Sequence, residues 1–181
     1  MVKEIEIKDK KFELFISEKK IKKVVKKIAN QISMDFYSEE VVFLSVLSGA
    51  IMFTVDLLKL IKVPCELTFL KVNSYLDIKS IGNVSKILGI DNDLTSKNVI
   101  IVEDIVDTGL TLTYIMNEIK QYSPKLVKIA SLLVKPSISR FPYRIDYIGF
   151  NIPDVFVVGY GLDYNGLGRN LTSIYKLVDN S

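Results

Sequence analysis

Three carboxylates stand close together in the run from Val99 to Thr111. Glu103 and Asp104 are adjacent, and Asp107 follows three residues later. Four branched aliphatic residues before them predict a short buried strand. Carboxylates at the carboxyl end of a strand can bind sugar hydroxyls or a divalent metal. The chain then turns into a helix through Thr108-Gly109-Leu110-Thr111, and the first N–H groups of a helix attract phosphate. The segment therefore offers binding groups for a sugar and for its phosphate.

Residue types that are rare or missing limit the chemistry further. The sequence has no histidine and a single cysteine, Cys65. Histidine general bases, serine–histidine triads and histidine-bound zinc are therefore excluded. One cysteine also excludes an intramolecular disulfide and a multi-cysteine metal site, and it favours a reducing compartment. Any proton transfer must use Asp, Glu, Lys, Tyr or Cys.

The apolar patterns around the acidic run predict a mostly parallel α/β sheet flanked by helices, because buried strands alternate with helices of ten or more residues. Strands are expected at 41–46, 65–72, 99–102 and 125–134, with short strands at 147–150 and 155–159 that complete the sheet. Helical spacing predicts one helix from Ser17, a second that runs to about Ile61 and a third that ends at Ser123-Pro124. Residues 4–15 alternate loosely and favour an edge strand or a hairpin.

Four stretches should meet beyond the carboxyl ends of these strands, where ligands bind in open α/β sheets. They are Ser48-Gly49, 103–111, Lys135 and 156–163. The acidic cluster is costly beside a buried strand unless a metal, ribose hydroxyls or protonation compensates it. A solvated turn that caps the next helix is the alternative interpretation.

A polar stretch at 73–93 is too long for a simple connection within a compact domain. Such a stretch is typical of a lid over a binding site. A short hairpin is expected within it, around 85–90. An ordinary surface loop is the alternative.

The totals are those of an ordinary soluble globular protein. The 181 residues are 49% hydrophobic and 25% charged, with a formal net charge of +3, which demands no nucleic-acid partner. The lysines between 19 and 27 are interpreted as the solvated face of an amphipathic helix, with a nucleic-acid or membrane patch as the alternative. The uncharged run 41–55 is shorter than the roughly 18 to 20 residues of a membrane-spanning helix. We therefore expect one cytoplasmic domain over 1–181, without membrane contact.

Several motifs together carry a resemblance to a known family. The run Val102–Thr111 resembles the phosphoribosyl-diphosphate motif of type I phosphoribosyltransferases, in its hypoxanthine-guanine phosphoribosyltransferase version. Leu132–Pro136 and Ile152–Asn165 resemble that family's purine-binding segments, in the same order and at fitting separations. Leu47–Ala50 and Asn73–Tyr75 stand where the family has its diphosphate loop and its flexible lid. The resemblance spans roughly residues 40 to 175.

The resemblance implies a fold and an assembly. It implies a type I phosphoribosyltransferase-like core with a small hood formed by terminal segments. The hood would comprise about 150–181 together with the N-terminal segment, and the lid about 73–93. The family usually forms homodimers or homotetramers.

For the sugar phosphate, the resemblance implies that Glu103 and Asp104 hold the ribose 2′- and 3′-hydroxyls, directly or through Mg²⁺. Backbone N–H groups from Asp107 through Thr111 would bind the 5′-phosphate, with the hydroxyls of Thr108 and Thr111. Gly109 would allow the phosphate to approach closely.

For the base, the resemblance implies that Asp107 lies near the purine N7 as general base. Lys135 would donate to the 6-oxo group and so select 6-oxopurines over adenine. Phe156 would stack on the base, while backbone groups of Val157 and Asp163 would bind its edge. An ordinary exposed lysine and a core phenylalanine are the alternatives for the two side chains.

For the diphosphate, the resemblance implies that Asp163 reaches a bound Mg²⁺ and that Arg169 contacts the diphosphate itself. Main-chain N–H groups at Ser48 and Gly49 would also bind it, through a strained or cis peptide. Ser74 and Tyr75 would close over the site and exclude water.

Two positions depart from the family pattern. Many relatives have lysine where this chain has Ser48, and a basic residue is common where this chain has Leu110. The first change puts diphosphate affinity in question. The second assigns Leu110 to a subunit contact instead.

The implied reaction joins hypoxanthine or guanine to 5-phosphoribosyl 1-diphosphate with Mg²⁺, and yields IMP or GMP and diphosphate. This is a purine salvage reaction, without a nucleic-acid or membrane partner. A relative that prefers xanthine is one alternative, because the three bases differ at the 2-position, where contacts are largely to backbone. A non-catalytic regulator that senses phosphoribosyl diphosphate and binds nucleic acid is another.

Overall fold

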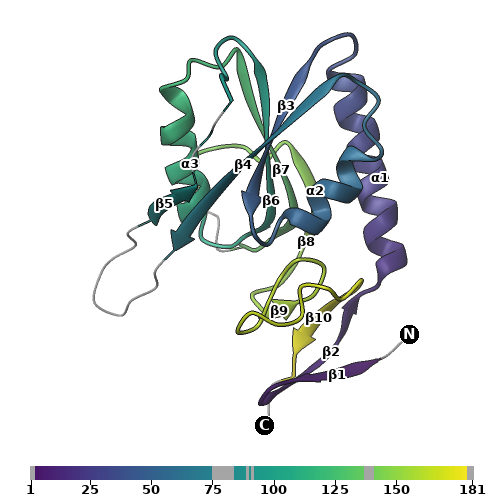
Figure 1. The fold of residues 1–181 in the computed structure, drawn as a ribbon. Coiled ribbons are helices and arrows are strands. Elements are labelled where there is room, and N and C mark those ends of the chain that lie inside the picture. Colours follow the sequence, from purple (N-terminus) through teal and green to yellow (C-terminus); the bar gives the residue numbers. More distant parts are fainter. Residues whose placement is uncertain (1–2, 75–83, 89, 91, 137–140, 179–181) are drawn as a thin grey trace.

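The computed structural model describes residues 3–74, 84–88, 90, 92–136 and 141–178. Within them, the largest element is a six-stranded sheet in the order β5-β4-β3-β6-β7-β8 (Figure 1). Neighbouring strands pair in parallel, except that β5 pairs with β4 in the antiparallel direction. The strands are β3 (Val41–Leu47), β4 (Cys65–Ser74), β5 (Val84–Leu88), β6 (Asn98–Val106), β7 (Leu126–Val134) and β8 (Tyr147–Asn151).

Helices cover both faces of this sheet. Successive residues of a strand point to opposite sides, so an apolar strand presents side chains to helices on both faces. In β3, Phe43 belongs to the core cluster of α1 (Glu18–Asp35) and α2 (Ile51–Leu58). Its neighbour Leu44 belongs to the cluster of α3 (Leu110–Lys120). Figure 1 shows α1 and α2 on one side of the sheet and α3 on the other. Burial on both faces explains the continuous apolar runs of the central strands.

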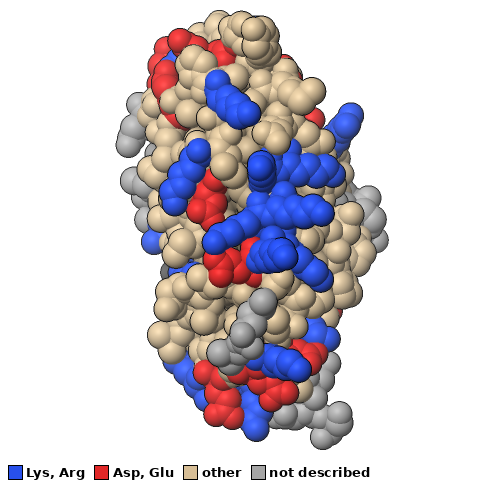
Figure 2. Space-filling model, turned by 90° about the vertical axis from the view of Figure 1, so that its right-hand side faces the viewer, with Lys and Arg blue, Asp and Glu red and all other residues tan. Residues whose placement is uncertain are grey.

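Helix α1 is amphipathic, as its sequence pattern predicts. Its buried side includes Ile21, Val25 and Ile28, each at most 1% exposed. Its lysines face solvent and gather on one surface of the molecule (Figure 2). No helix within the described residues is both long and apolar enough to cross a membrane.

A second, smaller sheet packs beyond the carboxyl ends of the parallel strands (Figure 1). Within the described residues it has the order β1-β2-β10-β9, with antiparallel pairs throughout. Both ends of the chain contribute to it, with β1 (Glu4–Ile7), β2 (Lys10–Ile16), β9 (Val157–Val158) and β10 (Ile174–Leu177). Its own core holds Phe12, Val158 and Tyr175.

The predicted α/β class with a mostly parallel sheet is confirmed. Residues 4–15, expected as an edge strand or a hairpin, form the hairpin of β1 and β2. The prediction that 155–159 completes the main sheet is wrong, because β9 pairs with β10 in the small sheet. Strand β10 was not predicted. Strand β6 is also longer than predicted, so that Glu103 and Asp104 lie inside it and not after its end.

The predicted lid at 73–93 lies largely outside the described residues. Within that stretch, β5 is described, and it pairs with the end of β4 where a hairpin around 85–90 was expected. Helix α2 ends at Leu58, slightly before the predicted end at about Ile61.

Candidate active site

A pocket of about 340 Å³ lies between the two sheets, at the carboxyl ends of β3, β6 and β7. Strand β6 and the segments that follow β6 and β7 supply its polar floor, and the residues around β9 supply its opposite wall. Predicted site residues that line the pocket are Gly49, Glu103, Asp104, Asp107, Thr111, Lys135, Phe156, Val157, Asp163 and Arg169. The fold thus gathers residues that are far apart in the sequence.

Glu103 and Asp104 form a buried acidic pair in β6, 7% and 9% exposed. Burial raises the pKa of both carboxyl groups, and the charge of Asp104 raises that of Glu103 further. The Oε2 atom of Glu103 is buried and has no hydrogen-bond partner among the described residues. A buried polar atom without a partner costs about 1–3 kcal/mol, which a cation or a hydroxyl donor would offset.

The loop after β3 lies directly against this acidic pair. Its Leu47–Ser48 peptide bond is cis. A Cβ atom on Gly49 would lie 1.6 Å from Oδ2 of Asp104, so any side chain at this position would displace the Asp104 carboxylate. The main chain of the loop therefore packs directly against the Asp104 carboxylate.

The predicted phosphate-binding turn joins β6 to α3. Gly109 has φ of +78° there, a conformation that favours glycine, and a Cβ atom would lie 2.8 Å from Cδ2 of Phe141. Thr108 Oγ1 accepts a hydrogen bond from the Leu110 N–H at 3.4 Å. Because the first N–H groups of a helix have no partner within the helix, the start of α3 suits an anion.

Lys135, the residue after β7, also lines the pocket. Its Nζ atom donates to Asp107 Oδ2 and to Asp154 Oδ1, both at 3.0 Å. Burial acts to lower the pKa of Lys135, but the hydrogen bonds and charges of the two aspartates outweigh it and raise that pKa. The lysine is thus a buried, charged donor at the pocket wall and not an exposed surface lysine.

Phe156 belongs to an aromatic group on the wall of the small sheet. Its ring centroid lies 6.3 Å from that of Phe12 and 5.9 Å from that of Tyr164, which it meets edge-on. The side chain is nevertheless 46% exposed. Phe156 is therefore held by other aromatic rings while it remains accessible to a ligand, unlike a core phenylalanine.

Asp163 and Arg169 form an ion pair within the segment that contacts the loop after β3. An Arg169 nitrogen lies 2.6 Å from Asp163 Oδ1, and another donates to the Gly161 carbonyl at 2.7 Å. A Cβ atom on Gly161 would lie 2.0 Å from the carbonyl oxygen of Gly49. The two backbone segments therefore touch above the acidic pair.

A family model described as the phosphoribosyl transferase domain matches residues 16–165, most of the chain. The chain belongs to this phosphoribosyl transferase family. Its curated relatives include proteins named hypoxanthine-guanine phosphoribosyltransferase. That of Mus spretus is 43% identical over 158 residues, 82% of this chain and 74% of that protein. That of Aquifex aeolicus (strain VF5) is 36% identical over 176 residues, 96% of this chain and 99% of that protein.

Solved structures of the family share the fold. A crystal structure of a hypoxanthine-guanine phosphoribosyltransferase from Bacillus anthracis superposes with a TM-score of 0.86 at 38% identity. The match covers 92% of this chain and 97% of that one. A hypoxanthine phosphoribosyltransferase from Staphylococcus aureus has a TM-score of 0.86 at 35% identity, over 92% and 91% of the two chains.

Other predicted residues of this phosphoribosyl transferase domain lie beside the pocket lining. Ser48 belongs to the loop after β3, and Thr108 and Gly109 belong to the turn between β6 and α3. Leu110 begins α3 with 52% of its surface exposed. Ser74 ends β4, whereas Tyr75 lies outside the described residues.

Two contacts of the phosphoribosyl transferase site were not predicted from the sequence. Asp154, the second partner of Lys135, stands inside the segment 152–165 that the family motif marks, but no spacing rule pairs it with a lysine 19 residues earlier. Tyr160, in the same segment, donates a hydrogen bond to Asp56, 104 residues away in sequence. Only packing brings these partners together.

Proposed function

We propose that this protein is a purine salvage enzyme that transfers the 5-phosphoribosyl group of phosphoribosyl diphosphate to hypoxanthine or guanine. The products are IMP or GMP and diphosphate. The names of the relatives support this activity. The observation that carries it here is one pocket lined both by a buried acidic pair, with Glu103 Oε2 unpaired within the described residues, and by a buried lysine.

The acidic pair is proposed to bind the ribose. Glu103 and Asp104 would accept hydrogen bonds from the 2′- and 3′-hydroxyls, which would satisfy Glu103 Oε2. The 5′-phosphate would lie at the start of α3, on N–H groups from Asp107 through Thr111. This arrangement leaves the anomeric carbon facing Lys135 and Phe156.

The same carboxylates suit Mg²⁺. The described residues contain no group of three or more His, Cys, Asp or Glu side chains arranged around one metal position. Mg²⁺ typically binds through one or two carboxylates together with substrate oxygens and water, so Glu103, Asp104 and Asp163 fit it as partial ligands. When bound, Mg²⁺ would offset the charge of the leaving diphosphate.

Lys135 is proposed to select the base. Its Nζ atom is a donor without acceptor capacity, so it would pair with a 6-oxo group and not with the 6-amino group of adenine. In the ligand-free protein Nζ is shared between Asp107 and Asp154. An incoming purine would therefore replace the Asp107 contact, while Asp154 keeps the lysine in place.

Asp107, once released from Lys135, would act as the general base. As the purine N9 forms its bond to the anomeric carbon, the bond from that carbon to the diphosphate oxygen breaks and its electron pair leaves with the diphosphate. The proton on N7 passes to the Asp107 carboxylate. Phe156 would stack on the base during this exchange, and Arg169 would contact the diphosphate.

The location and the assembly are also proposals. A cytoplasmic location agrees with the single cysteine. Leu110, which is 52% exposed at the start of α3, remains our proposed contact in a homodimer or homotetramer. Preference among hypoxanthine, guanine and xanthine depends on backbone contacts near Val157 and Asp163. The non-catalytic regulator has less support, because the pocket carries both a candidate base and a candidate leaving-group site.

The direct test is to incubate the purified protein with Mg²⁺, phosphoribosyl diphosphate and each of hypoxanthine, guanine, xanthine and adenine, and to follow nucleotide formation. We expect IMP and GMP and no AMP. Absence of turnover with both hypoxanthine and guanine would contradict the proposal. Omitting Mg²⁺ and adding a chelator serves as the control for the metal.

A further inference from the structure

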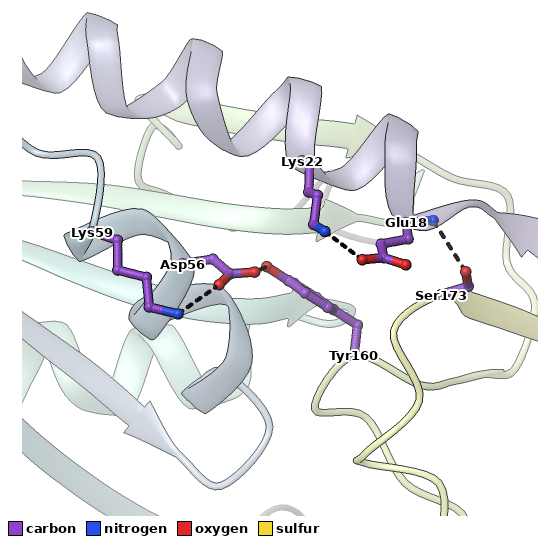
Figure 3. A network of polar contacts seen from close by, with 6 residues as sticks. All are labelled: Glu18, Lys22, Asp56, Lys59, Tyr160 and Ser173. Carbon is purple, nitrogen blue, oxygen red and sulfur yellow. Dashed lines mark hydrogen bonds and ion pairs between the residues drawn. The ribbon is translucent and has the colours of Figure 1, made fainter.

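The side chain of Tyr160 connects the wall of the pocket to helix α2. Tyr160 is 6% exposed, and its hydroxyl donates to Asp56 Oδ2 at 2.8 Å (Figure 3). Burial and the neighbouring Asp56 carboxylate raise the pKa of this hydroxyl, so it remains a protonated donor. The other Asp56 oxygen faces Lys59 at 3.5 Å on the exposed side. The tyrosine contact is therefore the buried one of the two.

The backbone around Tyr160 has little room to move. Tyr160 has φ of +52°, and its N–H donates to the Leu171 carbonyl at 2.8 Å. A Cβ atom on Gly159 would lie 2.1 Å from the Ser173 carbonyl oxygen, and one on Gly161 would lie 2.0 Å from that of Gly49. At Gly161 this segment thus packs directly against the Ser48–Gly49 loop.

Helix α2 is the element that directly follows the same loop. It begins at Ile51, and Asp56 lies in its second turn. Thr54, also in α2, shares a buried hydrogen bond of 2.7 Å with Ser45 of β3. The helix is thus fixed to the main sheet, and Asp56 presents a fixed acceptor to the wall of the small sheet.

We infer that Tyr160 and Asp56 are a positioning pair for the diphosphate half of the pocket. Their hydrogen bond fixes the segment 159–163 against α2, and so sets the spacing between the Ser48–Gly49 loop and the Asp163–Arg169 pair. The base half is held separately, by Lys135 and by the rings around Phe156. The inference rests on the proposed function, because it assigns a substrate group to each half.

A second tyrosine–aspartate pair provides a matched control. Tyr147 is 4% exposed, and its hydroxyl donates to Asp35 Oδ2 at 2.7 Å. This pair joins β8 to the end of α1 and is not part of the pocket lining. It has the same donor and acceptor types and similar burial, although Lys128 also donates to both partners. Neither residue of this pair adjoins a glycine packed against the diphosphate loop, as Tyr160 does.

The experiment compares Tyr160→Phe, Asp56→Leu and the double variant with Tyr147→Phe and Lys59→Gln. Asp56→Asn keeps an acceptor and tests rescue. Steady-state kinetics give KM for phosphoribosyl diphosphate and for hypoxanthine, and thermal unfolding with Mg²⁺ and inorganic diphosphate reports binding without turnover.

We expect the KM for phosphoribosyl diphosphate to rise about fivefold in Tyr160→Phe and in Asp56→Leu, and no further in the double variant. Stabilisation by diphosphate should weaken in parallel, while the KM for hypoxanthine stays within about twofold. Asp56→Asn should recover part of the affinity. Tyr147→Phe should lower Tm without either change, and Lys59→Gln should resemble the wild type.

The inference is overturned if Tyr160→Phe leaves both diphosphate readouts unchanged, if both KM values rise equally, or if Tyr147→Phe has the same effect. Failure of the proposed function has a different signature. In that case the wild-type protein itself forms no nucleotide, while thermal unfolding with diphosphate still decides whether the pair positions the loop.

Discussion

Two charged groups of the pocket, the Glu103–Asp104 pair and Lys135, are compensated in opposite ways. At the proposed ribose site, Glu103 and Asp104 are adjacent in β6, and Glu103 Oε2 has no partner among the described residues. At the proposed base site, the charge of Lys135 is shared by two aspartates at 3.0 Å. The acidic pair requires a cation or a hydrogen-bond donor from outside the chain to satisfy Glu103 Oε2. The charge of Lys135 is already neutralised, so a ligand there must exchange with an existing contact.

This difference assigns separate tasks to the three carboxylates of the acidic motif. Glu103 and Asp104 are suited to bind hydroxyls or a cation, because their burial favours any partner that offsets negative charge. Asp107 is half exposed and paired with a lysine, so it can change partners at modest cost. The predictions below test this division, from the largest expected effect to the smallest.

Asp107→Asn should have the largest effect. The substitution keeps the shape of the side chain but removes the proposed base, so kcat should fall roughly 100- to 10,000-fold. The KM for phosphoribosyl diphosphate should change little, as steady-state kinetics would show. Asp154→Asn is the matched control, since it alters the other partner of Lys135 and should leave most of kcat. Equal losses in the two variants would contradict the special role of Asp107.

Lys135→Met should have the second-largest effect on activity. It retains the length of the side chain and removes the charged donor to the 6-oxo group, so kcat/KM for hypoxanthine should fall roughly 10- to 100-fold. Discrimination against adenine should weaken at the same time. The measurement is kcat/KM for both purines in parallel. Undiminished selectivity for 6-oxopurines would place the selecting group elsewhere.

Phe156→Leu tests the stacking wall. Loss of the ring face should raise the KM for hypoxanthine roughly 3- to 10-fold, with the KM for phosphoribosyl diphosphate unchanged. Phe12→Leu is a useful comparison, because Phe12 supports the same cluster but is fully buried. That variant should lose stability first. A purine KM unaffected by Phe156→Leu would argue against stacking.

Glu103→Gln should have the smallest effect. It should raise the stability of the fold, whereas the variants above lower activity. Because burial raises the pKa of Glu103, the folded protein binds this proton more tightly than the unfolded chain, and wild-type stability falls as pH rises above the ordinary carboxyl range. The uncharged glutamine avoids that loss. In chelator and without substrate, the variant should therefore be about 1 kcal/mol more stable at neutral pH, roughly fivefold in the folding equilibrium.

Denaturant unfolding at several pH values measures this effect. The advantage of Glu103→Gln should shrink as pH falls towards the ordinary carboxyl pKa, where wild-type Glu103 is protonated in both states. Mg²⁺ with phosphoribosyl diphosphate should stabilise the wild type more than the variant. A variant less stable than the wild type at neutral pH would show that the glutamate charge is compensated within the protein.

Much of the fold could be predicted from local patterns. Continuous apolar runs identified β3 and β6, and the spacing of Ile21, Val25 and Ile28 identified α1, because burial on one or two faces leaves a direct mark on the sequence. The errors concern which strands pair with each other. Residues 155–159 were assigned to the wrong sheet, and β10 was missed, since a short strand does not reveal which strand it will pair with.

The same distinction between local pattern and tertiary contact applies to the site. The sequence by itself determined the acidic motif, the glycine turn at 109 and the family of the chain, because these features lie within short continuous segments. Only the tertiary structure decided that Glu103 is buried without a full set of partners, that Lys135 is shared with Asp154, and that Tyr160 reaches Asp56. Such contacts depend on the packing of one sheet against another, and neither residue type nor spacing specifies them.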